Sequence, residues 1–132
     1  MKGKTVRYLA FISFVIFFLT GTAFALTFNE LENNLDTDKN TKVSVKEYWK
    51  TVKGQEVSWT GSVVDVTSGK NRYKVSVKLG NKSRPNIILL TSDTAAVSLK
   101  KGHSVRFKGS LHTYRMWGRH LKVELDNVTI QK

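Results

Sequence analysis

Apolar and polar side chains alternate along most of the second half of the chain, which is the pattern of strands that bury one face. The clearest case is residues 72–79, where Tyr73, Val75, Val77 and Leu79 would point into a core. The polar residues between them would form a basic row on the other face. The same pattern predicts four further strands, at residues 55–67, 86–91, 103–113 and 121–130.

Two of these strands depart from simple alternation. The strand at 86–91 is apolar on both faces, so its outer side needs a cover, and we expect the helices that precede the strands, with Trp49, to supply it. In the strand at 121–130 the apolar positions change from odd to even numbers, which predicts a β-bulge near Asp126 and Asn127.

Capping-box patterns predict two helices before the first strand. In each, a hydroxyl residue stands three positions before a glutamate, namely Thr27 before Glu30 and Ser44 before Glu47. We therefore expect helices over 28–35 and 45–53, the second ending at Gly54.

Two of the connections between strands can also be predicted from composition. Residues 68–71, Ser-Gly-Lys-Asn, are typical of a hairpin turn. Ser92 or Asp93 can cap a short helix that runs through Leu99 and stops at Gly102. The expected order is three strands, a short helix and two strands.

An eleven-residue segment recurs within the chain. The sequence KGQEVSWTGSV from Lys53 returns 48 positions later as KGHSVRFKGSL from Lys101. Each copy carries a glycine inside its strand, Gly61 and Gly109, which favours two bent strands, as at the corners of a barrel. One repetition is too few for a solenoid, so a small closed β-barrel is the expected architecture.

The motifs KGQEVSWTGSVVDV from Lys53 and KKGHSVRFKGSL from Lys100, with the helix before the second, resemble those of OB-fold proteins. The resemblance is to exported bacterial OB-fold proteins and to the anticodon-binding-like (tRNA_anti-like) OB-fold domains. It implies a mainly β protein, a five-stranded OB-fold Greek-key barrel with a short helix between strands 3 and 4. An N-terminal helical extension would precede this barrel.

The first 25 residues have the features of a secretory signal peptide. Lys2, Lys4 and Arg7 precede an apolar run, and 23–25, Ala-Phe-Ala, is a cleavage signal. An uncleaved membrane anchor is the alternative, although the run is short for a span. The predicted organisation is a signal peptide at 1–25, a helical extension at 26–53 and a barrel at 54–132. We expect the mature protein in the periplasm or outside the cell, as a monomer without a membrane span.

Positive charge is concentrated in the second half of the chain of 132 residues, whose formal net charge is +12. Residues 66–132 carry 14 basic and 3 acidic side chains, whereas residues 26–65 carry 5 basic and 7 acidic ones. This asymmetry predicts a positive face and a polyanionic partner. A solvated basic surface without a specific partner is the alternative.

The resemblance implies a ligand face on strands 2 and 3 and on the loops that join strands 1 to 2 and 4 to 5. Cations and aromatic rings alternate there, as single-stranded nucleic acid requires for its phosphates and bases. The candidate ligand-binding residues are Lys70, Arg72, Lys74, Lys78, Tyr114, Arg115, Trp117 and Arg119. Two alternatives stay open: Trp117 could instead plug the barrel end, and an anionic oligosaccharide, a phospholipid head group or an acidic protein could be the partner.

A second possible function is a protein-interaction or stress-response module of the cell envelope. Its partner would meet the barrel edge and the apolar outer side of the strand at 86–91.

Residues 36–47 resemble a calcium-binding EF-hand loop. The candidate ligands are Asp36, Asp38, Asn40, Ser44 and Glu47. Thr41, however, occupies the position of the glycine that such loops need, and no second loop pairs with this one. The favoured interpretation is a polar linker before a capped helix, with no cofactor.

Catalytic sites are not indicated by the sequence. His112 and His120 could face each other across a hairpin, but two imidazoles make an incomplete metal site. No nucleophile elbow or phosphate-cradling loop is present, and the carboxylates of the barrel do not have the grouping of a nuclease site. We therefore expect a binding protein and not an enzyme.

Overall fold

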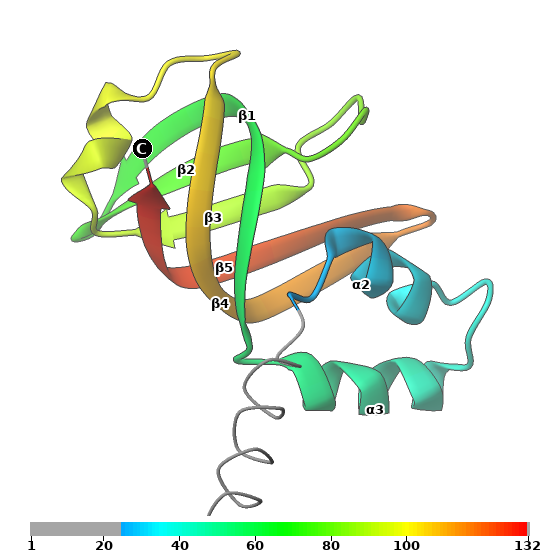
Figure 1. Ribbon diagram of the computed structural model, residues 1–132. Coiled ribbons are helices and arrows are strands. Elements are labelled where there is room, and N and C mark those ends of the chain that lie inside the picture. Colours follow the sequence, from blue (N-terminus) through cyan, green and yellow to red (C-terminus); the bar gives the residue numbers. More distant parts are fainter. Residues whose placement is uncertain (1–24, 132) are drawn as a thin grey trace, which may run out of the picture.

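A computed structural model describes residues 25–131, and the predicted signal peptide lies outside the described residues apart from Ala25. Figure 1 shows a barrel with two helices at one side of it. In chain order the elements are α2 (Phe28–Leu35), α3 (Lys42–Val52), β1 (Glu56–Gly69), β2 (Arg72–Lys78), β3 (Ile87–Thr91), the 3-10 helix η1 (Thr94–Ser98), β4 (Ser104–Trp117) and β5 (His120–Gln131).

The five strands close into a barrel in the order β1-β2-β3-β5-β4, with β4 returning to β1. β3 and β5 run parallel, and the other neighbouring strands are antiparallel. With η1 between β3 and β4, this is the OB-fold topology, so the predicted fold class is confirmed.

The two copies of the repeated segment pair with each other across the β1–β4 ladder. Trp59 lies opposite Phe107, which is the equivalent residue of the other copy, and Gly61 lies opposite Val105. β1 leaves β4 after Ser62 and continues along β2, with a register shift between Val63 and Asp65. A Cβ at Gly61 would lie 2.7 Å from the Lys78 carbonyl oxygen, which explains why this close approach of the two strands needs glycine.

Alternation places the barrel core as the sequence predicted. On β2, Val75 and Val77 are fully buried, while Arg72 and Lys74 are exposed. The predicted bulge in β5 is confirmed, since the β4–β5 register shifts there and Asn127 has a φ of +50°. The predicted hairpin turn tightens to Lys70 and Asn71, with Asn71 in the left-handed region.

α2 begins and ends where the sequence predicts, with the Thr27 hydroxyl accepting the Glu30 N–H at 3.1 Å. The prediction for α3 is wrong at its start. Thr41, and not Ser44, is the N-cap, because the Thr41 hydroxyl accepts the Ser44 N–H and moves the first turn three residues earlier.

Trp59 is one of the residues that attach the helical extension to the barrel. Its indole N–H donates to the Leu26 carbonyl at 2.9 Å, and its ring meets the Phe28 ring edge-on at 5.9 Å.

Burial and the nearby Glu30 carboxylate raise the pKa of the half-buried Tyr48 hydroxyl on α3, against a lowering contribution from Asn34. Between residues 25 and 131, no helix has the length and apolar character needed to cross a membrane.

Candidate functional site

The outer face of β2, β3 and β5 carries a groove whose floor is apolar. Ile88 and Leu90 of β3 point out of the barrel, yet they are only 5% and 7% exposed. The hollows that they line are bordered by side chains of the barrel strands and loops, and none comes from α2 or α3. The prediction that the helices cover this side of β3 is therefore wrong, because the neighbouring strands supply the cover themselves.

Three adjoining hollows make up this groove, and each shares lining residues with the next. The first, of about 200 Å³, is lined by Lys74, Ile88, Thr113, Tyr114, Arg115, Trp117, Lys122 and Glu124. The second, of about 540 Å³, is lined by residues 67–72 together with Lys74, Leu90 and Glu124. The third, of about 460 Å³, continues from Asn71, Arg72 and Leu90 to residues 126–129 of β5.

The β4–β5 hairpin forms one end of the groove, and Trp117 lies at this end. Its side chain is 47% exposed, so it does not plug the barrel. The ring stacks on His120 with centroids 6.5 Å apart and planes 7° apart. Arg115 Cζ and Lys122 Nζ lie 6.0 and 5.9 Å from the ring centroid. The Trp117 ring is thus exposed, and two cationic side chains lie near it.

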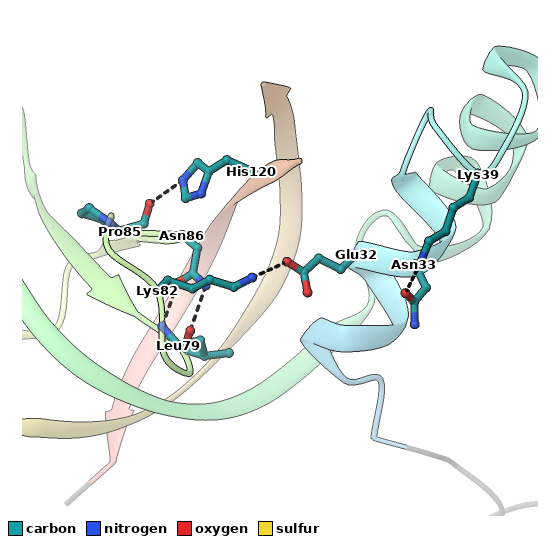
Figure 2. Close-up of polar contacts among 8 residues, drawn as sticks. All are labelled: Glu32, Asn33, Lys39, Leu79, Lys82, Pro85, Asn86 and His120. Atoms are coloured by element: carbon teal, nitrogen blue, oxygen red, sulfur yellow. Dashed lines mark hydrogen bonds and ion pairs between the residues drawn. The ribbon is translucent and has the colours of Figure 1, made fainter. Parts of the chain in front are cut away.

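The position of this hairpin is fixed by the loop between β2 and β3. His120 Nε2 lies 3.1 Å from the Pro85 carbonyl oxygen, as Figure 2 shows. The same loop is held at its base by Asn86, whose amide donates to the Leu79 carbonyl and accepts the Leu79 N–H. On the other side Lys82 Nζ lies 3.0 Å from the Glu32 carboxylate of α2. The loop therefore joins the hairpin to the helical extension.

Five of the eight candidate residues line the groove, and their side-chain contacts do not turn them away from it. They are Lys70, Arg72, Lys74, Arg115 and Trp117. The row on β2 and the hairpin, which the sequence could only suggest separately, face the same groove.

The other three candidates have further contacts or lie outside these hollows. Tyr114 is among the residues that line the first hollow, while its ring packs on Trp49 of α3, with centroids 4.7 Å apart. Arg119 Nε lies 3.7 Å from the Asp38 carboxylate, so this guanidinium faces the helical extension. Lys78 is half-buried opposite Ser62 and lines none of these hollows.

Sequence reasoning missed two charged residues of the groove, Lys122 and Glu124. β4 extends to Trp117 and turns through Gly118 and Arg119 only, which sets Arg115 opposite Lys122 and Thr113 opposite Glu124. Gly118 was the signal available in the sequence, because glycine is typical of a two-residue turn. In the structure it has a φ of +58°.

The two histidines of the hairpin do not face each other. His112 Nδ1 lies 3.3 Å from Asp126 Oδ2, whereas His120 sits at the hairpin end beside Trp117. Over residues 25–131, no three His, Cys, Asp or Glu side chains are grouped so that they could hold a metal ion.

The EF-hand-like segment forms a turn followed by a helix. Asp36 Oδ1 accepts the Asp38 N–H, and the Asn40 amide donates to the Asn33 and Asp36 carbonyls. Ser44 and Glu47 already lie within α3. The segment is thus a turn before a capped helix, and the expectation that it binds no calcium stays a prediction.

No protein-family model matches this chain, and no curated protein matches it. Among solved structures it is similar to a Klebsiella pneumoniae subsp. pneumoniae protein described as a "putative nucleic acid-binding lipoprotein", with a TM-score of 0.57 and 14% identity over 86% of this chain and 96% of that one. At this identity the likeness supports the fold alone.

Two looser similarities are to an OBody and to a heterotrimeric protein. OBody AM3L15, bound to hen egg-white lysozyme, gives a TM-score of 0.44 with 15% identity over 62% of this chain and 80% of that one. A Replication Protein A heterotrimer bound to ssDNA gives 0.37 with 11% identity over 60% and 58%. Membership of the anticodon-binding-like group stays a prediction.

Proposed function

We propose that this protein is an exported, non-catalytic OB-fold module that binds single-stranded nucleic acid along the groove. The observation that carries the proposal is the exposed Trp117 ring, with Arg115 Cζ and Lys122 Nζ 6.0 and 5.9 Å from its centroid, at the end of a groove bordered by Lys70, Arg72 and Lys74.

This combination suits a single strand because its phosphates and its bases need different kinds of contact. The phosphates are satisfied by cations that follow the backbone, and the bases are satisfied by an aromatic surface on which they stack. A base stacked on an aromatic ring contributes about 1–3 kcal/mol whatever its identity. An anionic oligosaccharide would use the same cations, but a flat ring flanked by cations favours the nucleic acid.

The description of the similar Klebsiella protein is consistent with the proposed ligand and with the proposed export. That protein is described as nucleic acid-binding and as a lipoprotein. Together with the predicted signal peptide, it favours a place in the cell envelope or outside the cell for this chain. A relationship to the anticodon-binding-like OB-fold domains would be consistent with the same ligand.

The alternative, a protein partner on the apolar outer side of β3, is less favoured. Ile88 and Leu90 are nearly buried, so they offer little apolar area to a partner. The barrel is closed, so it also offers no free strand edge in the described residues.

Fluorescence anisotropy with a labelled single-stranded oligothymidylate tests the proposal. Trp117→Ala should weaken binding roughly 5- to 150-fold, which corresponds to the loss of one stacked base. Val97→Ala is the control, because Val97 is also an exposed apolar side chain, 66% exposed, but lies on η1. Absence of binding by the unmodified protein at low salt, or equal losses in both variants, would contradict the proposal.

A further inference from the structure

The groove contains two carboxylates that differ in their surroundings. Asp126 Oδ2 is paired with His112 Nδ1 at 3.3 Å. The Glu124 side chain, by contrast, is partly exposed, and its carboxylate has no hydrogen bond or ion pair among residues 25–131. Its oxygens keep access to solvent, because no buried side-chain oxygen among these residues lacks a hydrogen-bond partner. Such a group is poised to accept a donor from a ligand.

Glu124 lies at the centre of the groove. In the sheet it is beside Ile88 of β3 and opposite Thr113 of β4. It lines both the hollow of about 200 Å³ that Trp117 borders and the next hollow of about 540 Å³. Lys74 is the other residue that the two hollows share. A ligand that follows the groove must therefore pass this carboxylate.

The charge of Glu124 restricts which part of a nucleic acid can lie beside it. A phosphate directly beside the carboxylate would be repelled, whereas Lys74, Arg115 and Lys122, which line the same hollow, would attract one to their own positions. The group that faces the carboxylate itself must instead donate hydrogen bonds. A cavity of about 150 Å³ holds one benzene ring, so a hollow of about 200 Å³ has room for a planar ring system.

We propose that Glu124 is a specificity-determining residue, which accepts hydrogen bonds from the amino edge of a base stacked on Trp117 and so selects guanine over thymine or uracil. The inference rests on the proposed function, because it assigns a specificity to the same groove. Guanine presents two adjacent donors, N1–H and the N2 amino group, which match the two oxygens of a carboxylate. Thymine and uracil present one N–H between two carbonyl oxygens, and the carboxylate repels these.

The test compares two labelled single-stranded oligomers in low salt, oligothymidylate and the same strand with one central deoxyguanosine. The unmodified protein should bind the guanine-containing strand roughly 5- to 150-fold more tightly, the range for a bidentate contact between a side chain and a base. Replacing this deoxyguanosine by deoxyinosine, which lacks the N2 amino group, should remove part of the preference.

Glu124→Gln should reduce the guanine preference to less than about twofold while leaving oligothymidylate binding equal or tighter, since a negative charge is removed. Asp126→Asn is the matched control, because it removes the same charge from the carboxylate that His112 already pairs. This control should keep the guanine preference. Thermal melts establish that both variants are folded, and the preference of the unmodified protein is measured independently of either.

Equal affinity of the unmodified protein for the two strands overturns the inference and leaves the proposed function standing. The inference also fails if Glu124→Gln and Asp126→Asn change the guanine preference alike, because the carboxylate then acts only through its charge. If neither strand binds at low salt, the proposed function fails and the specificity fails with it.

Discussion

The dependence of binding on salt follows from the number of cations along the groove. Five border it, namely Lys70, Arg72, Lys74, Arg115 and Lys122. If each neutralises one phosphate, the logarithm of the binding constant should fall with the logarithm of salt concentration at a slope of about −3.5, because each contact with a single strand contributes about −0.7. Raising the salt from about 50 to about 200 mM should then weaken binding roughly 100-fold.

Removal of two cations tests whether these side chains are the ones involved. Arg72→Ala with Lys74→Ala should reduce the slope to about −2.1, so that the same change in salt weakens binding only about 20-fold. Both side chains are exposed on β2, so the folded state should lose little stability. Lys46→Ala with Lys100→Ala is the control, since it removes the same charge from exposed positions outside the groove.

Anisotropy titrations at four or five salt concentrations give the slope for each protein. The reasoning is refuted if both double variants have the slope of the unmodified protein, or if both slopes fall equally. The first result would place the contacts elsewhere, and the second would mean that net charge alone attracts the strand.

Three further predictions concern the scaffold. Gly61→Ala should lower the free energy of unfolding by about 1–3 kcal/mol in chemical denaturation, since its Cβ would lie 2.7 Å from the Lys78 carbonyl oxygen. Gly69→Ala is the control, because its Cβ would have its nearest contact at 3.7 Å, and it should change this free energy by less than about 0.5 kcal/mol. Equal effects of the two substitutions would contradict the close approach of the strands at Gly61. Trp59→Phe, which removes the hydrogen bond to the Leu26 carbonyl, should cost about 0.5–1.5 kcal/mol in the same assay, and an unchanged midpoint would mean that this contact does not anchor the extension. Thermal melts with and without calcium should coincide, and a higher Tm with calcium would show that the turn before α3 binds it.

The barrel was predictable because alternation and bent-strand glycines are local signals. Each strand of the barrel needs one buried face, so the positions of Val75 and Val77 could be assigned without knowledge of their partners. The start of α3 was predicted three residues too late, because Thr41 and Ser44 can each supply a capping hydroxyl and the pattern favoured Ser44.

The candidate site was predicted only in part because the fourth strand was expected to end at residue 113. It continues to Trp117, so alternation still applies to the following residues and places Tyr114 on the face opposite to Arg115 and Trp117. When residues 114–117 are treated as a loop, alternation does not apply and the two faces cannot be distinguished. The contact of Arg119 with Asp38 depends on how the helical extension packs against the hairpin, which no local pattern predicts.

Mapping of amide chemical shifts by NMR tests the central claim most directly. On addition of a single-stranded oligonucleotide at low salt, the largest changes should occur at the Trp117 indole N–H and at the amides of β2, β3 and β5 that border the groove. The amides of η1 and the exposed face of α3 should change little. Shifts concentrated at η1 or α3, with the Trp117 indole unaffected, would contradict binding in the groove.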